Sequence, residues 1–369
     1  MKLYVSIFIS LVFISSSVFY TPSSSAIGII ETPIYKKKTD LCILDTPALG
    51  GDGNIYTTAG PSCNSFGQGV AAFDPLNGSV IWGPIIPDGC DKNNFPFFGS
   101  GVSIGANGLV YGVGDWNQCG NGRIVSFDSK DNGKIKWEHP GCGPHPRQVP
   151  ALNEANNSVY LGTNSLCSFD MDTGIKNWYQ GGGYYNGTKG IAIDSLQNIY
   201  QGTGEGSNLN IRSFTKDGGF RWSNEYQGSM HGLGIMAIMD NGSLLTYNNV
   251  DNKLIASNLD DYFLWSFSNL TNPVIDQEGN IYGNSVDTAE VVSLTSDGIE
   301  RWRTTFPNHN LARVDFVAAV GGVFVRADNI LYALNKENGS AVTVFEADAD
   351  LNVGAILVMG GKIFISDKV

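Results

Sequence analysis

The chain has 369 residues, of which 42% are hydrophobic and 16% charged, and its formal net charge at pH 7 is -12. This composition excludes a mainly disordered chain, because enough apolar residues are present to form a sizeable core. The negative charge argues against nucleic acid as a partner, since phosphate backbones would be repelled.

The N-terminus has the composition of a signal peptide. Met1 and Lys2 precede an apolar run from Leu3 to Tyr20, and small residues at 23–26 follow where a signal peptidase would cut. An uncleaved membrane anchor is the competing interpretation, because the run is near the minimum length of a membrane span. We predict a signal peptide over residues 1–26 and no membrane span after its removal. The protein is then expected to be secreted or to lie in the lumen of the secretory pathway.

Downstream of this segment, a short motif recurs eight times. Each copy has a turn residue followed by two or more residues that favour β-strands. The copies are Gly53-Asn54-Ile55-Tyr56, Gly108-Leu109-Val110-Tyr111, Asn157-Ser158-Val159-Tyr160, Gln197-Asn198-Ile199-Tyr200, Gly242-Ser243-Leu244-Leu245, Gly279-Asn280-Ile281-Tyr282, Gly321-Gly322-Val323-Phe324 and Gly361-Lys362-Ile363-Phe364. The last position moves from Tyr56 to Phe364 over seven intervals, an average of 44 residues. This period is typical of a four-stranded propeller blade.

A second motif follows the first in most repeats. It combines a small residue that enters a strand, a turn built from Asp and Gly, and a tryptophan on the next strand. Because the same large residue returns at the same place, we interpret these tryptophans as docking residues between neighbouring blades. They are Trp82, Trp137, Trp178, Trp222, Trp265 and Trp302.

The second motif resembles the tryptophan-docking pattern Ala-x-Asp-x-x-Thr-Gly-x-x-x-Trp of the pyrroloquinoline-quinone (PQQ) repeat family. Ser168 to Trp178 follows the pattern nearly residue for residue, and Ala72 to Trp82 has Asn77 in place of the threonine. The resemblance covers nearly all of the chain after the signal segment. It implies an all-β fold, namely an eight-bladed β-propeller that forms a single domain over residues 27–369. Seven blades are the alternative.

The last repeat is incomplete, because only five residues follow the copy that ends at Phe364. Another segment must supply the missing part of this blade. The apolar, β-prone segment 27–35 is our candidate for an N-terminal strand that closes the ring. Closure would hide strand edges that otherwise pair with other chains.

Six cysteines follow the signal segment, an even number that favours disulfide bonds in an exported chain. A zinc site is the competing interpretation, but no Cys-x-x-Cys pair is present, and we predict no metal. Four of the six lie in corresponding loops of the first two blades. We therefore predict the pairs Cys63–Cys90 and Cys119–Cys142, with Cys42 and Cys167 either paired or free.

The longest predicted loops lie on one face of the propeller, which we call the loop surface. It comprises residues 57–69, 83–101, 112–122, 138–149, 179–190 and 223–234. Loops of this length are often functional, and exposed aromatic side chains can stack on sugars or anchor a partner protein. The same side chains could instead pack the loops against one another. The candidate binding residues are Trp116, Arg147, Tyr184, Tyr185 and His231.

Six Asn-x-Ser/Thr sequons are candidate glycosylation sites in a eukaryotic secretory route. They lie at Asn77, Asn156, Asn186, Asn241, Asn269 and Asn338. In four of them the asparagine precedes glycine, which is also the preferred sequence of a tight turn.

The sequence contains no pattern of a nucleophile elbow, a metal-binding helix or a phosphate-binding loop, so no catalytic residue is assigned. We predict a monomeric, non-catalytic binding module for a protein or a glycan, without a cofactor. Two alternatives remain open. Relatives in the family include quinoprotein alcohol dehydrogenases, which implies an oxidoreductase with PQQ and calcium, although their adjacent-cysteine disulfide is missing here. A polysaccharide hydrolase or lyase is the other alternative.

Overall fold

The computed structural model of the chain is built from strands. It describes residues 4–10, 36–38, 41–43, 47–60, 69–87, 101–114, 122–143, 148–163, 165–181, 190–205, 208–227, 233–248, 252–285, 288–306, 316–319, 322–346, 357–359 and 362–367. Within these ranges the one helical element is a 3-10 turn at Glu154–Asn156. No helix in the same ranges is long and apolar enough to cross a membrane.

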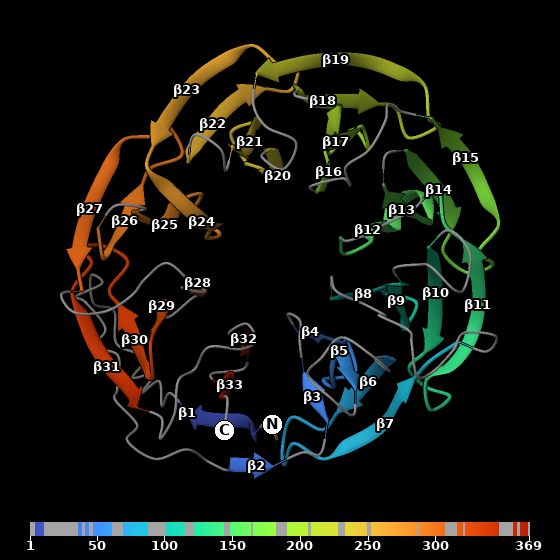
Figure 1. Cartoon of the computed structure of the whole chain (residues 1–369), viewed down its shortest axis with the longest axis horizontal. Coiled ribbons are helices and arrows are strands. Elements are labelled where there is room, and N and C mark those ends of the chain that lie inside the picture. The colour runs from blue at the N-terminus through green and yellow to red at the C-terminus, as the bar shows by residue number, and fades with distance from the viewer. Residues whose placement is uncertain are drawn as a thin grey trace, which may run out of the picture. The chain divides into compact units, whose positions relative to one another are not determined.

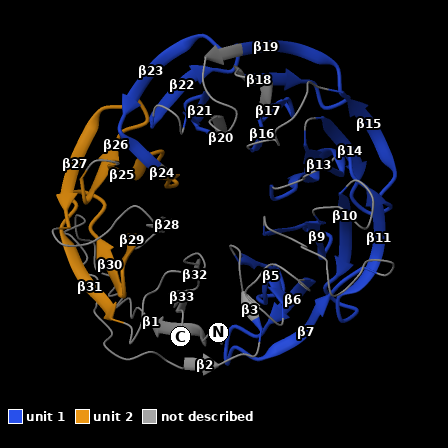
Figure 2. Ribbon diagram, viewed as in Figure 1, with its two compact units in different colours: residues 1, 40–271 blue, residues 2–39, 272–369 orange. Residues whose placement is uncertain are grey.

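The chain divides into two compact units (Figure 2). Unit 1 comprises residues 40–271, and unit 2 comprises residues 2–39 and 272–369. Each unit consists of antiparallel sheets, and each sheet corresponds to one predicted repeat. The all-β propeller fold predicted from the repeats is confirmed.

Unit 1 holds five sheets, numbered here in chain order. Sheet 1 contains β3 (Cys42–Ile43), β4 (Ala48–Leu49), β5 (Ile55–Gly60), β6 (Gly69–Phe73) and β7 (Val80–Ile85). Sheet 2 contains β8 (Val102–Ile104), β9 (Leu109–Gly114), β10 (Arg123–Asp128) and β11 (Lys134–Pro140). Sheet 3 contains β12 (Ala151–Asn153), β13 (Ser158–Gly162), β14 (Leu166–Asp170) and β15 (Lys176–Gln180).

The remaining sheets of this unit follow the same up-and-down order. Sheet 4 contains β16 (Ile191–Ile193), β17 (Ile199–Glu205), β18 (Asn208–Phe214) and β19 (Phe220–Gln227). Sheet 5 contains β20 (Leu233–Ile238), β21 (Ser243–Asn248), β22 (Lys253–Asn258) and β23 (Phe263–Ser268). In sheets 2 to 5 the first strand lies on the inner side of the unit and the fourth strand on its outer side (Figure 1).

Unit 2 contains two sheets of consecutive strands and one sheet assembled from both ends of the chain. Sheet 6 begins at the unit boundary with β24 (Leu270–Ile275), followed by β25 (Ile281–Ser285), β26 (Glu290–Leu294) and β27 (Glu300–Thr305). Sheet 7 contains β28 (Phe316–Ala319), β29 (Gly322–Ala327), β30 (Ile330–Leu334) and β31 (Ala341–Glu346). The terminal sheet has the order β2 (Lys36–Lys38), β1 (Tyr4–Ser10), β33 (Lys362–Asp367) and β32 (Leu357–Met359).

The terminal sheet corrects one expectation about the N-terminal strand. Segment 27–35, which was predicted to complete the last sheet, lies outside the described residues. The strand that pairs with β33 is β1, in a register that runs from Tyr4 opposite Asp367 to Ser10 opposite Lys362. The sequence of β1, Tyr-Val-Ser-Ile-Phe-Ile-Ser, is rich in β-branched and aromatic residues, so an apolar segment of signal-peptide composition also has high strand propensity. Seven sheets are therefore consecutive in sequence, and the eighth joins the two ends.

The recurring tyrosine of the first motif forms the core of most sheets. Tyr56, Tyr111, Tyr160, Tyr200 and Tyr282 are fully buried on the second strand of their sheets. Each ring lies 5.7 to 5.9 Å, between centroids, from the docking tryptophan of the same sheet. The apolar clusters join neighbouring sheets, for example Trp82 of sheet 1 with Val110, Val125 and Phe127 of sheet 2. The core is thus a series of interfaces between successive sheets.

Four docking tryptophans connect their sheet to the turn of the next sheet in the same unit. Trp137 Nε1 donates to the Met171 carbonyl at 2.9 Å, and Trp178 Nε1 donates to the Lys216 carbonyl at 2.9 Å. Equivalent bonds run from Trp222 to Leu259 at 3.1 Å and, within unit 2, from Trp302 to Lys336 at 2.7 Å. A glycine with positive φ lies under the indole in several of these turns. A side chain at this glycine would collide with the indole ring, and it would also be strained at a positive φ. The turn therefore requires glycine on both grounds.

Candidate functional site

The predicted binding residues all belong to loops outside the described ranges. Trp116, Arg147, Tyr184, Tyr185 and His231 lie there, as do Cys63, Cys90, Cys119 and the sequon at Asn186. The strand ends and loop bases that border these loops are described. The described part of the candidate site is its base, which consists of strand ends and loop ends of sheets 2, 3 and 4.

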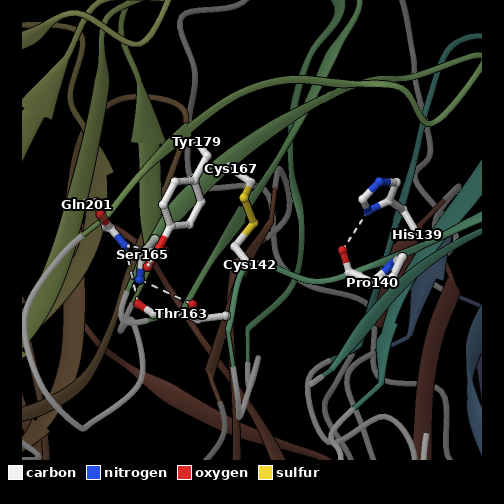
Figure 3. The surroundings of a disulfide bond; sticks show 8 residues. All are labelled: His139, Pro140, Cys142, Thr163, Ser165, Cys167, Tyr179 and Gln201. Atoms are coloured by element: carbon white, nitrogen blue, oxygen red, sulfur yellow. Dashed lines mark hydrogen bonds between the residues drawn. A yellow bond between two sulfur atoms is a disulfide. The ribbon is translucent and has the colours of Figure 1, made fainter. Parts of the chain in front are cut away.

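A disulfide bond fixes the base of the loop that follows sheet 2 (Figure 3). Cys142 lies just after β11, and it is bonded to Cys167 at the start of β14 in sheet 3, with 6.0 Å between the Cα atoms. Both cysteines are buried. The predicted pair Cys119–Cys142 is therefore wrong, because the loop is attached to the next sheet instead of to the preceding loop. None of the cysteines in the described part of the chain is free.

Buried polar groups surround this disulfide on the side of sheet 4. Gln201 of β17 donates its Nε2 to the carbonyl oxygens of Thr163 and Ser165, at 3.4 and 3.2 Å. The Ser165 hydroxyl in turn lies 3.0 Å from the Tyr179 hydroxyl of β15. Gln201, Thr163 and Ser165 are all buried, so these bonds replace water and fix the hairpin between β13 and β14. Figure 3 shows the cluster beside the disulfide.

One hydrogen bond connects the bases of two candidate loops. Gln148 Oε1 accepts the backbone N–H of Gly190 at 3.0 Å. Gln148 directly follows the predicted binding residue Arg147, and Gly190 ends the loop that carries Tyr184 and Tyr185. The structure thus brings together the anchor points of these two loops, which are 42 residues apart in sequence. The buried Nε2 of Gln148 has no hydrogen-bond partner within the described part of the chain.

The histidine near the disulfide, His139, is held by contacts with neighbouring residues of the fold. His139 Nδ1 lies 2.6 Å from the Pro140 carbonyl oxygen, and the imidazole packs against Phe169 with 5.0 Å between the ring centroids. Lys176 approaches the other ring, with Nζ 6.0 Å from the centroid of Phe169. These contacts orient His139 along the strands of sheets 2 and 3. In the described base of the site, the polar groups offer hydrogen bonds and no nucleophile beside a general base.

Two groups with shifted pKa values, Tyr200 and Asp276, serve turns of the fold. Burial raises the pKa of Tyr200 to about 12, and its hydrogen bond to Asp194 adds to the effect. For Asp276, burial would raise the pKa, but hydrogen bonds from Asn280 and Tyr282 outweigh it and lower the pKa to about 2. These carboxylates fix the turns that precede the recurring tyrosine. Their shifts therefore reflect structure and not a catalytic group.

The sequons differ in exposure. Asn77, Asn241, Asn269 and Asn338 are exposed, and in three of them the asparagine Oδ1 accepts the backbone N–H of the serine two residues on. Asn156 is half-buried and donates its side-chain N–H to the Tyr160 hydroxyl at 3.2 Å. Four of the described sequons therefore have room for a glycan, whereas a glycan at Asn156 would displace a contact to the core.

PQQ with calcium is the cofactor that the resemblance implies, and no described residue is assigned to it. The family's enzymes have a disulfide between adjacent cysteines, whereas the described disulfide joins residues separated by 25 positions. In the described ranges, no three His, Cys, Asp or Glu side chains are grouped so that they could hold a metal ion. No chemical step is assigned to this cofactor.

The fold and the docking contacts define a β-propeller of PQQ-like, tryptophan-docking repeats. A family model described as outer membrane protein assembly factor BamB matches residues 67–258, just over half of the chain. The chain belongs to this family. No curated protein matches the sequence.

Solved structures with the same fold include proteins of different kinds. BamB from Moraxella catarrhalis has a TM-score of 0.60 at 13% identity, over 89% of this chain and 99% of that one. The quinohemoprotein alcohol dehydrogenase ADHIIG from Pseudomonas putida HK5 has a TM-score of 0.57 at 12% identity, over 88% and 71%. A streptogramin B lyase has a TM-score of 0.50 at 15% identity, over 74% and 95%. At these identities the likeness concerns the fold alone.

Proposed function

We propose that the protein is a non-catalytic binding module that holds a protein or a glycan on its loop surface. The match to a family described as an assembly factor carries this proposal, because an assembly factor acts by binding other polypeptides. The rigid base supports it as well. A disulfide and the Gln148–Gly190 hydrogen bond hold loop anchors in place before a ligand arrives, which lowers the entropy cost of binding.

The proposed location is the outside of the cell or the lumen of the secretory pathway, with the mature protein a monomer. The disulfide between buried cysteines supports an oxidising compartment. The signal-like composition of residues 1–26 supports export. The exposed sequons are proposed to carry glycans if the route is eukaryotic.

A glycan array, combined with pull-down and mass spectrometry on the secreted protein, identifies the ligand. We expect Trp116→Ala and Tyr184→Ala to weaken binding of that ligand by about tenfold or more, since aromatic anchors dominate such interfaces. Phe220→Ala is the control, because Phe220 is an exposed aromatic residue on the outer strand β19. Normal affinity in both loop variants would reject the loop surface as the binding site.

The alternative activities have direct assays. Addition of PQQ and calcium to the purified protein, with alcohols or sugars and a redox dye, is expected to give no dye reduction. Polysaccharides incubated with the protein are expected to remain intact. Substrate-dependent turnover in either assay would contradict a non-catalytic module.

A further inference from the structure

Asparagine followed by glycine recurs in the turns of the described sheets. Asparagine is a thermolabile residue, and a following glycine leaves its side chain open to attack by the next backbone nitrogen, because glycine has no side chain in the way. The described part of the chain contains five such pairs, whereas Asn121 and Asn186 lie outside it. The five are Asn77-Gly78, Asn107-Gly108, Asn132-Gly133, Asn241-Gly242 and Asn338-Gly339.

The backbone of the five glycines is held in the same way. Each glycine has a positive φ, and each N–H donates to a main-chain carbonyl of its own turn at 2.8 or 2.9 Å. The acceptors are, in chain order, the carbonyl oxygens of Asp74, Gly105, Asp128, Met239 and Asn335. The attacking nitrogen is therefore equally restrained in all five pairs.

The asparagine side chains differ. In four pairs the asparagine Oδ1 accepts the backbone N–H of the residue two positions on, at 2.8 to 3.0 Å. These bonds join Asn77 to Ser79, Asn107 to Leu109, Asn241 to Ser243 and Asn338 to Ser340. Asn132 is exposed, and its side chain makes no hydrogen bond in the described structure. Its carboxamide alone among the five is free to rotate toward the backbone.

An additional residue in the turn of sheet 2 explains this difference. In sheet 3 the Gly174 N–H donates to a carbonyl four residues back, whereas the Gly133 N–H donates to one five residues back. The longer turn places Asn132 itself at a φ of +50°, a conformation that none of the other four asparagines has. The N–H of Lys134, two positions on, donates to the Asp131 carbonyl at 2.9 Å. The partner that the other asparagines use is therefore already occupied.

We propose that Asn132 is a site of spontaneous deamidation and isomerisation in the folded protein. The Gly133 nitrogen attacks Cγ of Asn132 and loses its proton to water. A C–N bond forms, the side-chain nitrogen leaves as ammonia, and a cyclic succinimide results. Water then opens this ring at either carbonyl carbon, which gives aspartate or isoaspartate. The only co-reactant is water, and no atom is oxidised or reduced.

The product acts on the docking of sheets 1 and 2. Gly133 lies under the indole of Trp82, so closely that an added Cβ would collide with the ring. Trp82 also belongs to the cluster that contains Val110 and Phe127 of sheet 2. Isoaspartate lengthens the main chain of the turn by one carbon and adds a negative charge, so it displaces Gly133 from the indole. The turn is separate from the loop surface, so the outcome here leaves the proposed function untouched.

Glycosylation does not protect this position. Asn132 is followed by glycine and lysine and is not a sequon, whereas Asn77, Asn241 and Asn338 are sequons. The comparison of the five pairs therefore uses full-length protein produced without glycans, in which all five side chains are free amides.

The test follows the five amides in one sample. The protein is kept in mildly alkaline buffer at physiological temperature, and peptide mapping by mass spectrometry measures the loss of each amide with time. We expect Asn132 to react at least about fivefold faster than the other four, which corresponds to about 1 kcal/mol, the net value of the hydrogen bond that they must break. In concentrated urea the five rates should converge, because the turns are unfolded. Equal rates in the folded chain, or a lead of Asn132 that persists in urea, would overturn the proposal.

Two variants separate the added charge from the added backbone carbon. Asn132→Gln should remove the reaction from this turn, since its longer side chain forms the corresponding ring less readily. Asn132→Asp carries the charge on an unchanged backbone. An isoaspartate-specific methyltransferase with labelled methyl donor should label the peptide around residue 132 in the aged unchanged chain and not in aged Asn132→Gln. Absence of label from that peptide would overturn the assignment of the site. The aged chain should unfold at a lower urea concentration than fresh Asn132→Asp, and equal midpoints would overturn the effect on docking.

Discussion

At the scale of single residues, the repeat depends on a large indole above a glycine. Trp137 lies over Gly174, which has a φ of +71° and whose added Cβ would be 2.5 Å from the ring. The same arrangement joins Trp178 to Gly218 and Trp302 to Gly339. The places of the tryptophans follow from the repeat in the sequence. The contact with glycine does not, because the two residues belong to different repeats and meet only in the folded chain.

This contact leads to a prediction about stability. Gly174→Ala should lower the free energy of unfolding by about 3 kcal/mol, because it combines a positive-φ penalty with a collision in a packed interface. Gly242→Ala is the matched control, since Gly242 has a φ of +79° and nothing within 4 Å of an added Cβ. It should cost only about 1 kcal/mol. Urea unfolding measures both, and equal losses would show that the indole contact does not contribute.

A second residue-scale prediction concerns acid. The folded pKa of Asp276 is about 2, below that of an unfolded chain. A group with a lowered folded pKa contributes stability above its unfolded pKa and loses it as the pH falls through the folded value. Asp276 should therefore contribute on the order of 2 kcal/mol near neutral pH, and this contribution should decline between about pH 4 and pH 2.

The variant Asp276→Asn tests this contribution. It should be less stable than the unchanged chain at neutral pH, and the difference should shrink toward about pH 2, because the carboxyl group is then protonated in the unfolded state and increasingly protonated in the folded state. Unfolding by urea at several pH values measures the difference. A difference that stays constant with pH would show that the ionised carboxylate of Asp276 is not what stabilises the turn.

At the scale of elements, the disulfide shows what sequence spacing cannot decide. Cys142 is separated from Cys119 by 23 residues and from Cys167 by 25, so both loops would have nearly the same entropy of closure. The choice depends on the packing of β11 against sheet 3, which brings Cys142 next to β14. Corresponding loop positions in two repeats are therefore a poor guide to pairing, because a loop also touches the next sheet.

Removal of this disulfide gives a prediction. The double variant Cys142→Ser with Cys167→Ser should be less stable by about 3 kcal/mol, the value expected for a loop of this length. Thermal and urea unfolding measure the loss, and peptide mapping of the unchanged protein should find the two cysteines in one cross-linked fragment. A cross-link from Cys142 to Cys119 would contradict the assignment.

At the scale of the whole molecule, the propeller fold and the strand order within each sheet could be read from the sequence, since each repeat brings its own turn and strands, and most repeats bring a tyrosine and a docking tryptophan. The loops could not be read in the same way, because their sequences do not repeat. The hydrogen bond of Gln148 with Gly190 illustrates this, as it joins two unrelated loops. The N-terminal strand was also placed wrongly, because 4–10 and 27–35 have similar strand propensity.

The role of β1 can be tested on the whole chain. Residues 27–369 and residues 1–369, both refolded so that no peptidase acts, should differ in melting temperature. The shorter chain lacks the strand between β2 and β33, so we expect it to melt at least about 3 °C lower. Equal melting temperatures would show that another segment pairs with β33 once residues 1–26 are removed.

The direction of the indole hydrogen bonds has a consequence for synthesis on the ribosome. In each observed case the tryptophan reaches forward by 34 to 38 residues, to a turn made later in the chain. A nascent sheet can therefore dock as soon as about one more repeat has emerged, and the docking contacts need no distant partner. The pairing of β1 with β33 is the exception, since it joins residues as far apart in sequence as Tyr4 and Asp367.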